Sequence, residues 1–135
     1  MPRLGTLNAH MGLLPMYRGM NVAEWAALNG EPVGCTVHFI DPGIDTGAIV
    51  AVRPVDTSDV ASIAGLRARV DAAQIALLGE VVRLVCRTGS RPEARPQRGD
   101  EGRQYFRMHP ELRARLEAAA SSAETAQPRP SPATG

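Results

Sequence analysis

The chain has 135 residues, of which 15 are basic and 14 acidic, giving a formal net charge of +1. This length is typical of one domain, and the balanced charge gives no electrostatic reason to expect nucleic acid as a partner. Every basic residue is arginine, which excludes a lysine nucleophile or a Schiff base. Neither a signal peptide nor an apolar run of transmembrane length is found, so we expect a cytoplasmic protein without membrane contact.

A short strand is predicted over residues 4–8. Side chains alternate along a strand, so Asn8 and His10 would point to the same side at its carboxyl end. In α/β sheets, binding sites are built at that end. A loop follows, and Arg18 and Gly19 close it.

A short helix is predicted between Asn21, as its N-cap, and Asn29, with Glu24 at the spacing of a capping box. Two strands, 33–40 and 48–55, then form an antiparallel hairpin. The loop between them, 41–47, is longer than a simple reversal needs, and we interpret it as functional.

His38 lies on the first hairpin strand, near this loop. Alternation places it with Thr36 on one face, where a role in the pocket wall and a structural role both remain open. His10, His38 and Asp45 or Asp41 are chemically able to bind a metal. No metal site is predicted, because the tight ligand spacing of strong zinc motifs is absent.

A long helix is predicted after a cap at Thr57 or Ser58, with apolar residues at three- and four-residue spacing that indicate packing on a sheet. Its arginines, Arg67 among them, fall off this stripe and are predicted to be solvated. Both cysteines, Cys35 and Cys86, lie in apolar runs and are predicted to be reduced core residues.

Three regions follow from these patterns: residues 1–88 as the domain that carries the site, 89–120 as an extension, and 121–135 as a disordered tail. Within the extension, residues 103–110 are expected to dock as an aromatic anchor. Pro110 is predicted to start a short helix over 111–120.

Asn8, His10 and Asp45 have complementary chemistry. An imidazole moves a proton near neutral pH, a carboxylate orients it, and an amide N–H stabilises an oxyanion. No serine or cysteine stands beside His10, so direct attack by a substrate group on a carbonyl carbon is favoured over covalent catalysis.

Three linked motifs resemble the family of formyltransferases that use 10-formyltetrahydrofolate, which includes glycinamide ribonucleotide, methionyl-tRNA and amino-sugar formyltransferases. The resemblance covers residues 4 to about 85. The motifs are Asn8-x-His10-x-x-Leu13-Leu14-Pro15-x-Tyr17-Arg18-Gly19, Gly34-x-Thr36-Val37-His38 and Ile44-Asp45-x-Gly47.

The resemblance implies a catalytic trio in which Asp45 keeps His10 cationic, with 10-formyltetrahydrofolate as formyl donor. It also implies a cofactor pocket shaped by Gly34, Asp41, Pro42, Gly43 and Ile44. Apart from the resemblance, Tyr17, Arg18 and His38 are candidate substrate residues. For Arg18, contact with the folate and a loop salt bridge are the alternatives.

The implied fold class is α/β: the C-terminal part of a Rossmann-like formyltransferase domain, with a small mixed sheet, a β-hairpin and a long packing helix. Family members begin with a further Rossmann-like half, which we expect transfer to need. Three explanations stay open: a misassigned gene start, a chain that is a fragment, or a partner chain that supplies that half. Without it, a sheet edge would be uncovered and available for association.

The expected acceptor is a small-molecule primary amine. No basic patch replaces the tRNA-holding domain of the methionyl-tRNA enzymes, so nucleic acid is not expected. Gln74 stands where the glycinamide enzymes carry a substrate motif, which disfavours that substrate. Two alternatives stay open: hydrolysis of formyltetrahydrofolate, and a non-catalytic remnant or subunit of a formyltransferase.

Overall fold

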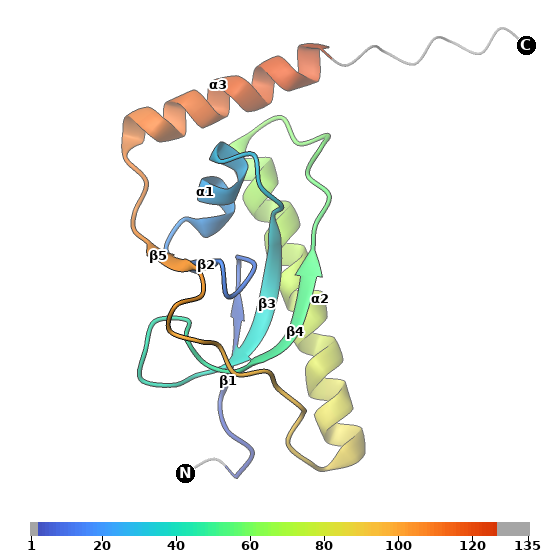
Figure 1. Ribbon diagram of the computed structural model, residues 1–135. Helices are drawn as coiled ribbons and strands as arrows, with labels where there is room; N and C mark the ends of the chain where they lie inside the picture. Colours follow the sequence, from blue (N-terminus) through green and yellow to red (C-terminus); the bar gives the residue numbers. More distant parts are fainter. Residues whose placement is uncertain (1–2, 127–135) are drawn as a thin grey trace, which may run out of the picture.

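A three-stranded antiparallel sheet forms the centre of the computed structural model, which describes residues 3–126 (Figure 1). Its order is β1 (Leu7–His10), β3 (Gly34–Phe39) and β4 (Ile49–Pro54). The hairpin of β3 and β4 confirms the prediction. β1 starts later than predicted and contains both Asn8 and His10, because its pairing with β3 continues as far as His10 opposite Thr36.

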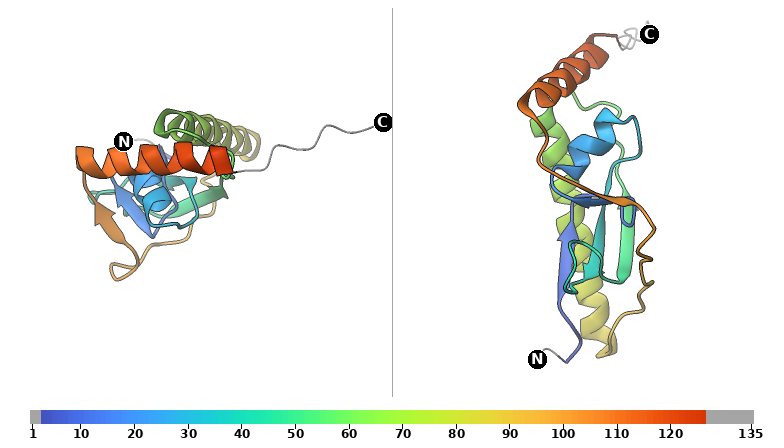
Figure 2. Two further views of the ribbon diagram at one scale, coloured as in Figure 1. Left: turned by 90° about the horizontal axis from the view of Figure 1, so that it is seen from above. Right: turned by 60° about the vertical axis from the view of Figure 1, so that its left-hand side comes forward.

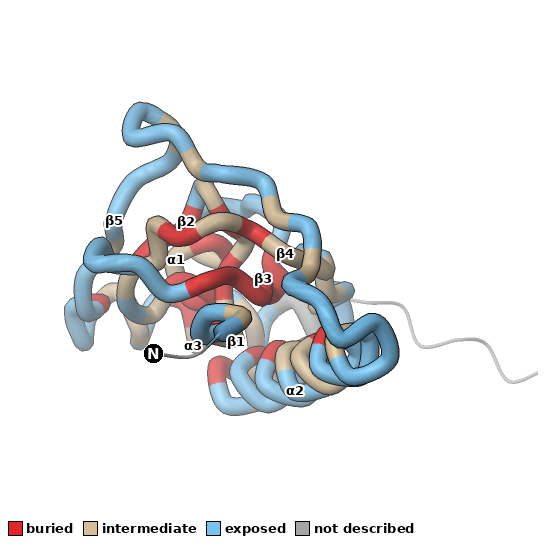
Figure 3. The backbone as a smooth tube through the Cα atoms, turned by 90° about the horizontal axis from the view of Figure 1, so that it is seen from below, coloured by how far each residue is buried: buried red, intermediate tan, exposed pale blue. Residues whose placement is uncertain are grey.

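One face of this sheet is covered by the long helix α2 (Ile63–Thr88) (Figure 3). Strand residues Cys35 and Val37 are fully buried in one core cluster with apolar residues of α2. The α2 members of that cluster are Leu66, Val70, Leu77 and Val81. The predicted apolar stripe is therefore the packing face of the helix, since these residues recur on one side of it.

The predicted cap of α2 was wrong, whereas the predicted start of α1 after Asn21 is confirmed without its side-chain cap. The cap of α2 is Ser62, whose hydroxyl accepts a hydrogen bond from the Gly65 N–H at 3.0 Å. The helix α1 (Val22–Leu28) has no side-chain cap, because Asn21 is left-handed with φ 52° and its Oδ1 accepts from the Met108 N–H at 2.9 Å. This contact between residues 87 positions apart in the chain has replaced the local capping box.

The C-terminal extension docks on the amino-terminal part of the chain. β5 (Arg103–Tyr105) pairs in parallel with β2 (Tyr17–Gly19), separately from the main sheet. The ring of Tyr105 stacks on that of Tyr17 at 4.9 Å, so Tyr105 is the predicted anchor, whereas Phe106 is 68% exposed.

Beyond β5, the helix α3 (Pro110–Ala126) lies across α1 and α2 (Figure 2). Its first residue agrees with the predicted start at the proline. It runs past the predicted boundary at 121, and the remainder of the predicted tail lies outside the described residues. None of the helices in residues 3–126 is long and apolar enough to cross a membrane.

The cysteines differ in exposure, and this corrects the prediction that both lie in the core. Cys35 is buried and its pKa is raised by burial, whereas Cys86 is exposed on α2. We expect a thiol reagent to modify Cys86 about a hundredfold faster than Cys35 in the folded chain. Mass spectrometry of the Cys86→Ser variant checks this: rapid labelling of that variant would contradict the burial of Cys35.

Candidate active site

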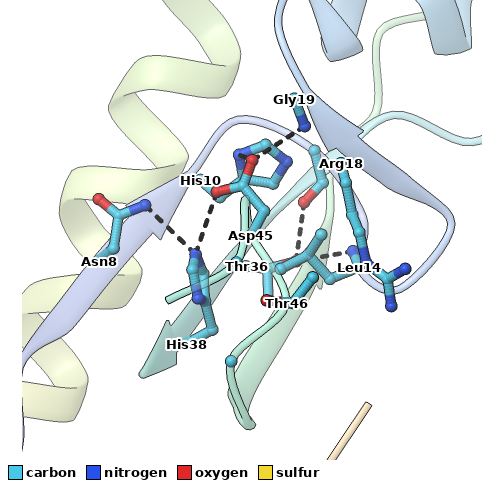
Figure 4. Close-up of polar contacts among 12 residues, drawn as sticks. Asn8, His10, Leu14, Arg18, Gly19, Thr36, His38, Asp45 and Thr46 are labelled. Carbon is cyan, nitrogen blue, oxygen red and sulfur yellow. Dashed lines mark hydrogen bonds and ion pairs between the residues drawn. The ribbon is translucent and has the colours of Figure 1, made fainter. Parts of the chain in front are cut away.

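The face of the sheet opposite α2 carries the polar side chains. In the register of the strands, Asn8 lies opposite His38 and His10 opposite Thr36. Because alternate residues face α2, these four side chains share the other face. Asn8 Nδ2 lies 3.2 Å from His38 Nε2, and Figure 4 marks this contact with a dashed line. The predicted alternation of the hairpin strand is therefore observed, and it brings His38 into the site.

Asp45 reaches over this face from the 41–47 loop and lies between the two imidazoles (Figure 4). Its Oδ2 is 3.5 Å from His10 Nδ1, and its Oδ1 is 3.5 Å from His38 Nε2. Oδ2 also accepts a hydrogen bond from the Gly19 N–H at 2.9 Å. The structure thus brings together Asn8, His10 and Asp45, as predicted, with His38 as a fourth member.

The backbone of Asp45 is left-handed, with φ 54°. Aspartate and asparagine tolerate this region better than other residues with side chains. The Gln97 Nε2 group holds the loop by donating to the carbonyls of Asp45 and Gly47 at 2.9 and 2.7 Å. Gln97 was not predicted, because it lies in a polar linker with no periodic pattern.

Each imidazole donates one ring N–H to a backbone carbonyl. His10 Nε2 donates to the Tyr17 carbonyl at 2.7 Å, and His38 Nδ1 donates to the carbonyl of its neighbour Phe39 at 2.8 Å. Since a carbonyl can only accept, these contacts place the proton of each neutral ring on the nitrogen away from Asp45. Protonation of the second nitrogen of either ring would turn its contact with Asp45 into an ion pair.

The pKa values of the two histidines shift in opposite directions. Burial lowers the pKa of His10 and outweighs the attraction of Asp45, whereas for His38 burial is outweighed by Asp45 and the Phe39 carbonyl, so its pKa is raised. Burial opposes charge on Asp45, but the two histidines and the Gly19 N–H lower its pKa. The pKa of His38 therefore lies above that of His10, so His38 is the more easily protonated of the two rings, whereas the resemblance implied a cationic His10.

The charge of His38 determines which atoms of Asn8 are free. With neutral His38, the Nε2 atom accepts a hydrogen bond from the Asn8 amide. With cationic His38, Nε2–H donates to Asp45 and the Asn8 amide nitrogen no longer has an acceptor there. The N–H groups of the Asn8 amide are then free to stabilise an oxyanion.

Three predicted binding residues have structural roles in this fold. The Tyr17 ring is 2% exposed and packs in the core, and burial raises its pKa to about 12. The buried Arg18 guanidinium donates to Gln97 Oε1 at 2.8 and 3.0 Å, in place of a salt bridge. Gly34 lies at the opposite end of β3 from the loop, packed against Leu13 and Arg53.

The predicted cofactor residues Asp41, Pro42 and Gly43 lie in an exposed loop, as does Ile44. Asp41 Oδ1 accepts from the Gly43 N–H at 2.9 Å and from the Thr46 hydroxyl, which fixes the turn. The loop thus presents backbone and the apolar Ile44 side chain next to Asp45. Within residues 3–126, no cluster of three or more His, Cys, Asp or Glu side chains is arranged to hold a metal ion.

Fold and site together define an α/β protein with an amide, two imidazoles and one carboxylate on one sheet face. The model of the formyl transferase family matches residues 1–82. The chain belongs to this family. The resemblance noted from the motifs is therefore confirmed.

Curated relatives include methionyl-tRNA formyltransferases. That of Flavobacterium psychrophilum is 45% identical over 67 residues, which are 49% of this chain and 21% of the relative. The enzyme of Parabacteroides distasonis is 48% identical over 67 residues, which are 47% of this chain and 21% of that relative. The chain therefore spans about a fifth of the length of these relatives. Because they are named for a tRNA substrate, the predicted exclusion of nucleic acid is not supported.

Solved structures with the same fold include sugar-modifying enzymes. The formyltransferase PseJ of Anoxybacillus kamchatkensis, solved with a formamido sugar nucleotide and tetrahydrofolate, has a TM-score of 0.66 and 28% identity. The match covers 74% of this chain and 51% of PseJ. HypX of Aquifex aeolicus has a TM-score of 0.64 and 26% identity over 91% of this chain and 23% of that protein. The predicted formyltransferase fold class is thus confirmed.

Proposed function

We propose that this chain carries the catalytic residues for transfer of a formyl group from 10-formyltetrahydrofolate to a primary amine. The observation that supports this most strongly is the carboxylate of Asp45 between the imidazoles of His10 and His38, with the Asn8 amide alongside. This arrangement handles the two needs of the reaction, an acceptor for a proton and donors for an oxyanion.

In the proposed reaction, the amine nitrogen attacks the formyl carbon and the formyl oxygen gains negative charge. The Asn8 N–H groups donate to that oxygen once cationic His38 is paired with Asp45. The neutral His10 has an unprotonated Nδ1 next to Asp45 and takes the proton that the amine loses. The C–N bond to tetrahydrofolate then breaks, and the same proton passes to the departing nitrogen, so the products are a formamide and tetrahydrofolate.

The loop residues 41–44 fit the folate donor, which supplies the electrophilic formyl carbon when bound. The loop is exposed next to Asp45, and the Ile44 side chain is 55% exposed. An apolar side chain beside exposed backbone suits a flat heterocycle that needs both contact area and hydrogen bonds. PseJ, with which the chain shares its fold, was solved with tetrahydrofolate.

Transfer is proposed to need a Rossmann-like amino-terminal half that completes the folate pocket. In residues 3–126, β1 has β3 as a neighbour and no strand on its other side. The N–H and C=O groups along that edge are suited to pairing with a further strand. The chain spans only 51% of PseJ, which is consistent with a contribution from outside this chain.

The test measures tetrahydrofolate release from 10-formyltetrahydrofolate with an amino-sugar acceptor. It is run with the 135-residue chain alone and with the amino-terminal half of a relative added. We expect release with the added half, together with binding of folinic acid by calorimetry. Neither binding nor release from a folded chain in both settings would overturn the proposal. Release of formate without any amine would instead favour hydrolysis.

A further inference from the structure

The linker between α2 and β5 contacts the Asp45 loop through the side chain of Gln97. Its Nε2 donates to the carbonyls of Asp45 and Gly47 at 2.9 and 2.7 Å. Its Oε1 accepts from Arg18 Nε and Nη2 at 3.0 and 2.8 Å. A side-chain amide has two N–H groups and one oxygen with two lone pairs. All four positions of the Gln97 amide are therefore in use, two toward the loop and two toward β2.

Arg18 determines which end of this amide faces the loop. Its guanidinium is 6% exposed and also donates to the Arg98 carbonyl at 3.3 Å. Because a guanidinium has donors and no acceptor, it keeps the Gln97 oxygen on its own side and turns Nε2 toward the loop. A flipped amide would place N–H groups against the guanidinium and an oxygen against two carbonyls. The orientation of the amide is therefore fixed by hydrogen-bond polarity.

The strand β2 also holds the carboxylate of Asp45. The Gly19 N–H donates to Asp45 Oδ2 at 2.9 Å, and Gly19 follows Arg18 directly in β2. This strand thus holds Asp45 twice, at the carboxylate through Gly19 and at the backbone through Arg18 and Gln97. On its other side the loop lies tightly on β3, because a Cβ on Gly47 would overlap a backbone carbonyl of that strand.

The segment that carries Gln97 is itself docked beyond β5. Glu24 of α1 is fully buried, and its Oε1 accepts from Arg113 of α3 at 3.3 Å. The same oxygen accepts from Arg67 of α2 at 2.8 Å, so Arg67, which was predicted to be solvated, is ion-paired and partly exposed. Gln97 therefore approaches the loop from a segment that is fixed on both sides, at α2 and at β5.

We propose that Gln97 is a positioning residue for the proposed formyl transfer. With Arg18 behind it, the Gln97 amide fixes the backbone of Asp45 so that the carboxylate stays between the two imidazoles. Both contacts of Asp45 with His10 and His38 are 3.5 Å long, and charge attraction weakens as the separation grows. The effect of Gln97 on turnover rests on the proposed function, whereas its effect on the position of Asp45 does not.

The Gly19 N–H reports on the position of Asp45, because Asp45 Oδ2 is its acceptor. Gln97→Ala removes both donations to the loop. Hydrogen exchange at the Gly19 amide of the 135-residue chain, followed by NMR, should therefore become about tenfold faster. That factor corresponds to the loss of one or two net hydrogen bonds. Unchanged exchange in the folded variant would overturn the proposal.

The imidazole of His38 gives a second readout. Burial opposes charge on His38, and its pKa is nevertheless raised, chiefly by the Asp45 carboxylate. The other titratable groups that face it are Asp41 of the same loop and His10, whose ring centroid lies 6.2 Å away. Gln97→Ala keeps all of these side chains but releases the loop, so the pKa of His38 should fall in an NMR titration. An unchanged titration would contradict a role in holding the carboxylate.

Gln97→Glu separates donation from packing. The glutamate is nearly the same size and can pair with Arg18 through charge-assisted hydrogen bonds, but it has no N–H group for the loop carbonyls. It should keep the fold and still make exchange at the Gly19 amide as fast as in Gln97→Ala. Exchange as slow as in the unchanged chain would show that donation is not needed and would overturn the proposal.

Gln104→Ala is the matched control, since Gln104 is an exposed glutamine on β5, the strand that pairs with β2. It should leave the Gly19 exchange and the His38 titration unchanged. Effects equal to those of Gln97→Ala would show a general loosening of β5 and would also overturn the proposal.

Turnover is measured with the amino-terminal half of a relative added. Gln97→Ala should lower kcat for formyl transfer by a factor of about 10 to 100 and leave KM for the amine nearly unchanged, because a misplaced catalytic group slows the chemical step. An unchanged kcat would refute the role in transfer. If no chain turns over while both NMR effects are present, the proposed function is refuted and the positioning of Asp45 by Gln97 stands.

Discussion

Replacing His10 with alanine is expected to lower kcat for formyl transfer by a factor of about 100 to 1000, as for loss of a general base or an oxyanion partner. His10 is 7% exposed and is held by the Tyr17 carbonyl, with Nδ1 next to Asp45. The variant has no group left in that position to take the proton of the amine. Turnover is measured as tetrahydrofolate release.

The same change also removes a buried hydrogen bond, which leaves the Tyr17 carbonyl unpaired and costs about 1–3 kcal/mol of stability. Ser62→Ala is therefore the matched control, because it removes the α2 cap and costs about 1 kcal/mol at a site far along the chain from His10. The Ser62→Ala variant should have a lower Tm and an unchanged turnover. If His10→Ala retains turnover while folded, the assigned role of His10 is wrong.

Asp45→Asn is expected to lower the pKa of His38 and to reduce transfer by a factor of at least about 100. The raised pKa of His38 depends on the Asp45 carboxylate, which opposes the effect of burial. Without it, burial lowers the pKa of His38 and favours the neutral ring, whose Nε2 accepts from the Asn8 amide. Asparagine suits this test, because it tolerates the left-handed backbone at position 45.

The His38 titration, followed by NMR of the imidazole nitrogens, measures this effect directly. A pKa raised on folding stabilises the protein below the unfolded value of 6.5, and that stability is lost as pH rises through the folded value. Asp45→Asn should therefore abolish the contribution of His38 to the stability of the folded chain at pH values below 6.5. Asp59→Asn is the control, since Asp59 is paired with Arg69 on the surface. An unchanged His38 titration in Asp45→Asn would contradict the charge assignment.

The sequence pattern predicts the hairpin, the long helix and the shared face of Asn8 and His10, because period-two and helical spacings are local properties. It also places Asp45 with His10, although the linked motifs were needed to join positions so far apart in the chain. Local patterns do not reveal which helix residue will be the cap. At α1, the contact of Asn21 with Met108 overrides a capping box that the local sequence favours.

The contacts of Gln97 and Glu24 near the site were also not predicted, because their partners lie far away in the sequence. Gln97 holds the loop of Asp45 from a linker about fifty residues further along the chain. Glu24 reads as a capping residue in sequence, yet it is fully buried between arginines of two other helices. A buried charge is recognisable only once its partners are known, and these partners lie 43 and 89 residues away.

The docking of β5 and α3 has a consequence for how acceptor choice changes in evolution. The family match ends at residue 82, before the segment that supplies Gln97, Arg107 and Arg113. That segment lines a hollow together with Arg67 and holds the Asp45 loop from outside. Under the proposed transfer, substitutions or insertions there change which amines are admitted while Asn8, His10 and Asp45 stay the same. Acceptor choice and bond chemistry would then be encoded by separate segments of the chain.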